Sequence, residues 1–174
     1  NSPPPLHPLL LTGTALAAVP LASFLAFSVQ PLAGKLLLPV QGGAATTWLG
    51  TMLFFQCALL CGYGWAAWLL RRRAAFQAGA TVALCFAALA SCRLARIADS
   101  RWTGLGGVVL ALALASLPAM VLLFSIGPLM HGWLRRRGQA VPYHLYACSN
   151  AGALLAVLLY PFTIERAVGL SDQM

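Results

Sequence analysis

Long apolar stretches dominate the chain and alternate with short polar segments that are rich in arginine, proline or glycine. A helix needs about 20 consecutive apolar residues to cross the hydrocarbon core of a bilayer. Five stretches reach or approach this length, at residues 9–29, 46–70, 74–92, 105–130 and 143–161. Because backbone groups in lipid must be hydrogen-bonded within their own segment, the pattern predicts an all-α integral membrane protein, a polytopic bundle of about five transmembrane helices.

Prolines mark the points at which these spans should bend or end, because proline lacks the N–H group of a helical hydrogen bond. Pro20 lies inside the first span and predicts a kink there, whereas Gln30 and Pro31 predict its end. The apolar residues 32–39 then lie at the membrane interface or in an extension of the first span. Two prolines in the fourth span predict one kinked helix or a helix with an offset final segment.

The composition agrees with a membrane location. Apolar residues make up 60% of the 174 residues and charged residues only 8%, whereas an ordinary soluble domain has about 25% charged residues. This excludes a soluble enzyme, a disordered tail and a disulfide scaffold. The five cysteines all lie in apolar surroundings, which favours a packing role; they are Cys57, Cys61, Cys85, Cys92 and Cys148.

Basic residues give the chain a net charge of +8 and gather in clusters between the spans. They do not interleave with aromatic residues, so no nucleic-acid partner is expected. Two compact triplets directly follow spans and lie on the side of the N-terminus; they are Arg71, Arg72, Arg73 and Arg135, Arg136, Arg137. The positive-inside rule therefore predicts a cytoplasmic N-terminus. A second interpretation is that the triplets bind anionic lipid headgroups.

Two segments resemble a known family. Residues 27–66 read FSVQPLAGKLLLPVQGGAATTWLGTMLFFQCALLCGYGWA. The second segment is GPLMHGWL, followed by PYHLYACSNAGALLAVLLYPFTIERAVGL up to residue 170. Both segments resemble the N-terminal membrane domain of bacterial fused transporter-like/spermidine-synthase-like proteins. The resemblance lies in the order of the motifs along the chain and in the string SN-x-G…YP…E.

This resemblance implies a domain of the bacterial inner membrane that precedes a further span and a cytosolic domain of the methyltransferase or aminopropyltransferase type. The 174 residues contain neither a nucleotide-binding glycine-rich loop nor an acidic cluster for a polyamine. We therefore expect them to be non-catalytic, without a metal or other cofactor.

Polar residues within apolar spans are the best indicators of function in such a chain. The candidates are Gln30, Lys35, Gln56, Ser149, Asn150 and Glu165. Lys35 is expected to extend its amine to the interface, or alternatively to face a cavity and pair with Glu165.

Asn150 is the most informative of these residues. Its amide must find a partner inside the bundle or on another subunit. It either holds helices together or contacts a ligand. We expect Ala147 and Ala151 to share its packed face and Leu145, Leu155 and Leu159 to face lipid.

His131 and His144 follow the fourth span and begin the fifth, so that two axial haem ligands are conceivable. Both lie beside an arginine triplet, which favours ordinary interfacial histidines. Three functions remain open. The chain is a membrane domain that anchors or serves a transferase, an accessory subunit that packs within a larger complex and contacts lipid or pigment, or a small transporter.

Overall fold

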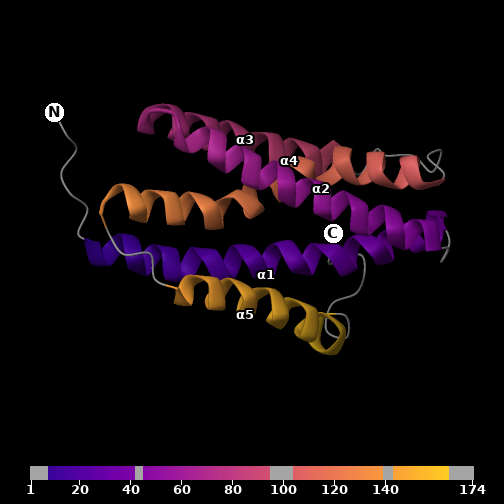
Figure 1. Ribbon diagram of the computed structural model, residues 1–174. Helices are drawn as coiled ribbons and strands as arrows, with labels where there is room; N and C mark the ends of the chain where they lie inside the picture. The colour runs from indigo at the N-terminus through magenta and orange to yellow at the C-terminus, as the bar shows by residue number, and fades with distance from the viewer. Residues whose placement is uncertain (1–7, 42–44, 95–103, 139–142, 165–174) are drawn as a thin grey trace. The chain divides into compact units, whose positions relative to one another are not determined.

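The computed structural model describes residues 8–41, 45–94, 104–138 and 143–164, and these residues are almost entirely helical (Figure 1). The elements are α1 (Pro8–Gln41), α2 (Ala45–Leu70), α3 (Ala74–Leu94), α4 (Gly104–Arg136), α5 (His144–Leu159) and the π-helix η2 (Tyr160–Ile164). Five segments are long and apolar enough to cross a membrane. The prediction of an all-α polytopic bundle is confirmed, and the chain is a multi-pass membrane protein.

The helix α1 is longer than the sequence pattern predicts. It continues for 34 residues, through Gln30 and Pro31 to Gln41, so the expected end at this pair is wrong. A proline removes one backbone hydrogen bond, but leaving the helix in an apolar medium would expose several unsatisfied groups. The helical continuation therefore has the lower free energy. The helix α4 likewise runs unbroken for 33 residues past both of its prolines.

Serine hydroxyls accompany three of these prolines, two or three residues before each of them. Every hydroxyl donates to a backbone carbonyl of the preceding turn, a bond that commonly accompanies helix bending. The bonds run from Ser28 to Phe24 (2.8 Å), from Ser116 to Leu112 (2.9 Å) and from Ser125 to Leu122 (2.7 Å). The hydroxyls thus satisfy their own hydrogen-bonding needs inside an apolar segment.

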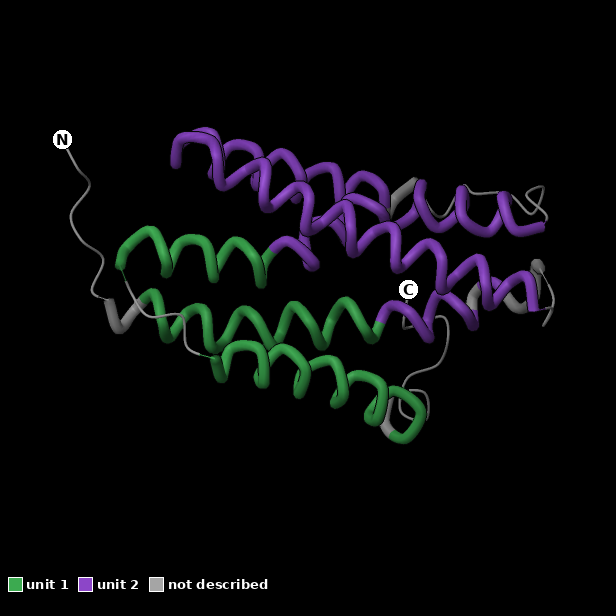
Figure 2. The backbone as a smooth tube through the Cα atoms, in the orientation of Figure 1, with its two compact units in different colours: residues 1–28, 126–174 green, residues 29–125 purple. Residues whose placement is uncertain are grey.

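The chain divides into two compact units (Figure 2). Unit 1 consists of residues 1–28 and 126–174, and unit 2 consists of residues 29–125. Both boundaries fall within helices, so that α1 and α4 each contribute to both units.

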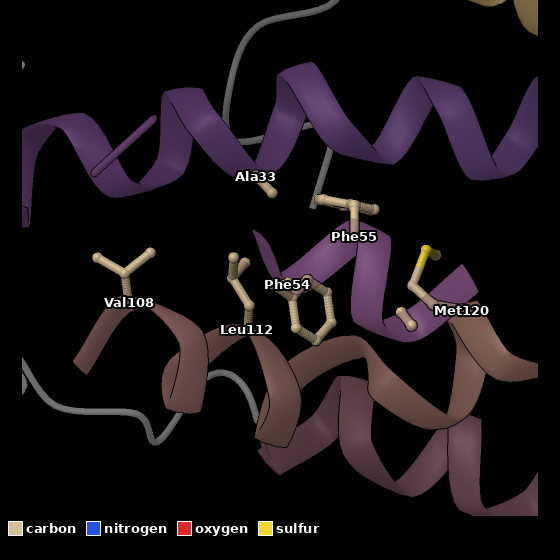
Figure 3. Close-up of a cluster of buried hydrophobic side chains, with 7 residues drawn as sticks. Ala33, Phe54, Phe55, Val108, Leu112 and Met120 are labelled. Atoms are coloured by element: carbon tan, nitrogen blue, oxygen red, sulfur yellow. The ribbon is translucent and has the colours of Figure 1, made fainter. Parts of the chain in front are cut away.

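The core of unit 2 forms where α2 meets the second half of α1 and the first part of α4 (Figure 3). Its buried side chains are Ala33, Phe54, Phe55, Ala58, Val108, Leu112 and Met120. The rings of Phe54 and Phe55 meet edge to face, with centroids 5.2 Å apart. Glycines let the helices come close: a Cβ at Gly62 would lie 2.6 Å from the Cβ of Phe124. Packing of small against large residues thus holds this unit together.

The core of unit 1 is smaller. Ala15 and Val19 of α1 pack with Leu134 of α4 and Leu145 of α5, and all four are buried. The partly buried Leu11, Leu16 and Met130 surround them. Unit 1 therefore brings the first half of α1 together with the end of α4 and the start of α5, and it contains most of the polar contacts described below.

Candidate functional site

The described polar candidates divide between the two compact units. Gln30, Lys35 and Gln56 belong to unit 2, whereas Ser149 and Asn150 belong to unit 1. Glu165, the alternative partner suggested for Lys35, lies outside the described residues, so the pairing stays a prediction.

Ser149 contributes to the contact between α1 and α5. Its hydroxyl oxygen lies 2.7 Å from that of Ser23, and one hydroxyl donates to the other in a partly buried setting. Interhelical hydrogen bonds of this kind are worth roughly 0.6 to 2 kcal/mol in membrane proteins. Ser23 is not among the residues predicted from the sequence, although its hydroxyl within the first apolar span could have identified it as a site for an interhelical hydrogen bond.

Gly152 brings the two backbones together one turn further along α5. A Cβ at this position would collide with the carbonyl oxygen of Pro20 and would lie 3.0 Å from its Cα. Only glycine fits such an approach, because the neighbouring atoms belong to the backbone and cannot rotate away. The contact between α1 and α5 thus combines a hydroxyl pair with a glycine that permits direct backbone packing.

The buried face of α5 is not the one that we expected. Leu145, Gly152 and Ala156 are buried, and with Ser149 they follow a spacing of four, three and four residues, which is one stripe of a helix. Asn150 is exposed, as are Ala147 and Ala151. Of the two locations predicted for Asn150, inside the bundle or against another subunit, the first is wrong, because its neighbour Ser149 is the residue that meets α1.

Two of the three leucines assigned to lipid are exposed, whereas Leu145 is completely buried. The amide of Asn150 therefore lies on the outer face of α5, among apolar side chains. Gln56 occupies a similar position on α2, where it is exposed between the exposed residues Leu53 and Leu60. Both spans thus present an amide on a surface that is otherwise suited to lipid or to another helix.

His131 packs against the aromatic ring of Tyr146. The two rings are stacked with centroids 4.5 Å apart and planes 20° from parallel. The Nδ1 atom of His131 lies 2.8 Å from the carbonyl oxygen of Gly127. Its Nε2 atom is buried and has no hydrogen-bond partner within the described part of the chain. His144 is exposed.

The haem interpretation, which needs two axial ligands, stays untested by these positions. Among the residues that the structure describes, no group of three or more His, Cys, Asp or Glu side chains could hold a metal ion.

Both arginine triplets are exposed. In the turn between α2 and α3, the guanidinium of Arg72 lies 4.7 Å from the ring centroid of Trp68, a cation–π contact. The side-chain Nε2 of Gln77 donates to the carbonyl oxygen of Arg72 at 2.9 Å and fixes this turn. In the second triplet, Arg135 and Arg136 line an open hollow at the end of α4.

No protein-family model matches the chain, and neither the comparison with curated proteins nor that with solved structures returns a match.

Proposed function

We propose that the chain is a non-catalytic membrane domain that anchors a larger protein by helix packing, and that the outer face of α5 docks onto another membrane-spanning helix. Five apolar helices fit an anchoring role. The observation that carries the proposal is the exposed amide of Asn150 on α5.

An exposed amide on a membrane helix needs a partner. Transferring such a group into hydrocarbon without a hydrogen bond costs several kcal/mol. A neighbouring helix with a polar group can remove most of this cost. Ala147 and Ala151 share the exposed side of α5 with Asn150, and small residues at a spacing of four let a second helix approach closely. The outer face of α5 therefore has the chemistry of a helix-packing surface.

The resemblance of residues 27–66 and 127–170 to the membrane half of spermidine-synthase-like fused proteins supports a more specific version. In this version the chain lies in a bacterial inner membrane with a cytoplasmic N-terminus and anchors or serves a cytosolic transferase domain. The helix that covers α5 then belongs to the same longer protein. The alternative is an accessory subunit, in which the covering helix belongs to a separate protein.

Photo-cross-linking in native membranes tests this proposal. A benzoylphenylalanine at position 150 should form cross-links to protein, whereas the same group at Leu89, an exposed apolar position of α3, serves as the matched control. An intramolecular product supports the longer protein, and an adduct of higher mass supports a separate subunit. Cross-linking to lipid alone at position 150 contradicts the proposal.

A separate experiment tests the non-catalytic role. Transfer of a labelled methyl or aminopropyl group by the purified chain at enzymatic rates would contradict it.

A further inference from the structure

A shallow hollow, wide open to its surroundings and with about 340 Å³ of space above the helix, lies at the end of α4. It is lined by Gly132, Arg135 and Arg136. The spacing of three and four residues places all three on one side of the helix, where side chains of adjacent turns meet. Gly132 has no side chain, so it contributes only backbone to the lining beside the two arginines.

Both arginines lack a carboxylate counterion in the part of the chain that the structure describes. That part contains no Asp or Glu at all, since the three acidic residues are Asp99, Glu165 and Asp172. The hollow is therefore a concentration of positive charge beside a helix whose strongest apolar segment has a mean hydropathy of 2.5. It faces the layer in which an apolar span meets water.

The end of a helix carries about half a unit of negative charge, which opposes anion binding. Here this charge is reduced by backbone hydrogen bonds, because the amides of Arg137 and Gly138 donate to the carbonyls of Leu134 (3.1 Å) and Arg135 (3.0 Å). Gly138 closes the turn with a φ of 68°, a conformation that glycine adopts without strain. The two full positive charges of Arg135 and Arg136 therefore outweigh the helix dipole.

We propose that this hollow binds a phosphate group whose negative charge is not neutralised by an attached ammonium. A guanidinium presents paired N–H donors that match two oxygens of one phosphate, and it does so more specifically than an ammonium. Two such groups across an open glycine give a phosphate several charge-assisted hydrogen bonds. The phosphate belongs either to a lipid headgroup or to a soluble phosphate. This proposal is independent of the docking role of α5.

Lipid retention by the full chain tests the proposal. The chain is purified from mixed vesicles of phosphatidylglycerol and phosphatidylcholine, and native mass spectrometry counts the bound molecules of each. The double variant Arg135→Gln/Arg136→Gln should lower the preference for phosphatidylglycerol about tenfold or more. The matched control is Arg71→Gln/Arg73→Gln, which removes the same charge from the other triplet and should lower the preference less than about threefold.

A second variant separates the hollow from its charge. Gly132→Leu fills the space and leaves both arginines in place, so it should lower the preference as strongly as the double variant. Circular dichroism and the thermal midpoint in detergent identify variants that fail to fold. An equal loss in both arginine double variants, together with full binding by Gly132→Leu, overturns the proposal, because the preference would then follow net charge alone.

Inorganic phosphate and pyrophosphate distinguish the two sources. Added to the chain in phosphatidylcholine nanodiscs, either anion should bind to the unchanged protein but not to Gly132→Leu if the ligand is soluble. If the ligand is a lipid, neither anion binds measurably and phosphatidylglycerol does. When neither the anions nor phosphatidylglycerol binds in preference to phosphatidylcholine, the proposal is wrong.

Discussion

At Gly152 a single hydrogen atom in place of a side chain decides how α5 meets α1. The space that a Cβ would need is occupied by the backbone of Pro20, and a backbone cannot move aside as a flexible side chain does. The hydroxyl pair of Ser23 and Ser149 lies in the same contact. The contact therefore depends on residue size at one position and on hydrogen bonding at a neighbouring one.

We expect Gly152→Ala to destabilise unit 1 by about 1–3 kcal/mol, the usual cost of overpacking a tight contact. Thermal unfolding in detergent, followed by circular dichroism, measures this change. Gly64→Ala is the matched control because a Cβ at Gly64 meets nothing within 4 Å, and its midpoint should stay level or rise. Equal midpoints for Gly152→Ala and the unchanged protein would show that α1 and α5 do not approach as described.

His131 offers a second test at the scale of one residue. Its buried Nε2 atom has no described hydrogen-bond partner, and an unsatisfied buried group costs about 1–3 kcal/mol. His131→Phe keeps an aromatic ring against Tyr146. It removes the unsatisfied Nε2 atom, which is a gain in stability, and the bond to the carbonyl oxygen of Gly127, which is a loss. The thermal midpoint should therefore stay level or rise. His131→Ala loses the stacked ring and should lower it. If both variants lower the midpoint equally, Nε2 has a polar partner that accounts for its burial.

Among the elements, α5 shows what the sequence pattern predicts and what it does not. The length of an apolar run predicts a membrane span because hydrocarbon thickness sets helix length. The buried face is harder to predict, because a helix that is apolar on all sides has no polar face to mark its orientation. Ser149 and Asn150 are adjacent polar residues, and only the close approach at Gly152 determines which of them meets α1.

The ends of helices and the hollow lined by Arg135 and Arg136 are also hard to predict from the sequence. Gln30 and Pro31 predict an end in water-soluble chains, yet α1 continues through them because its backbone stays satisfied only as a helix. The sequence marks both arginine triplets as clusters of charge. It does not distinguish the triplet that adjoins a hollow from the one whose Arg72 packs against Trp68, because this difference arises from local geometry.

Substitution of Ser149 should lower the stability of the isolated chain, whereas substitution of its neighbour Asn150 should not. Ser149→Ala removes an interhelical bond and should cost the isolated chain roughly 0.6 to 2 kcal/mol. Asn150→Leu changes an exposed position and should leave the thermal midpoint in detergent unchanged, while it weakens assembly with the covering helix. The yield of cross-links to protein from a benzoylphenylalanine at Ala151 in native membranes measures that assembly, whether the covering helix belongs to the same protein or to a separate one. A lower midpoint for Asn150→Leu with unchanged assembly contradicts the proposed role of this face.

For the whole molecule, the order of helices relates the two arginine triplets. The first triplet follows α2, the second lies at and just after the end of α4, and two potential spans, α3 and α4, separate them. We predict that both spans cross the membrane, which would return the chain to the same side and place both triplets there. Their density favours the cytoplasm.

Labelling of single cysteines tests this orientation. In a variant without the natural cysteines, a cysteine at Gly138 should resist a membrane-impermeant maleimide in intact cells and react after permeabilisation. A cysteine at Ala74, the first residue of α3, should behave identically. Reaction of both positions in intact cells reverses the orientation, and opposite behaviour of the two contradicts the crossing of α3 and α4.

The central claim is that another helix covers the outer face of α5. Oxygen accessibility measured by electron paramagnetic resonance in native membranes tests it most directly, with a nitroxide placed in turn at Asn150 and Ala151 of α5 and at Leu89 of α3 in the background without natural cysteines. All three side chains are exposed on the chain itself. We expect low oxygen accessibility at Asn150 and Ala151 and high accessibility at Leu89. Equally high accessibility at all three positions would show that lipid surrounds this face and would contradict the claim.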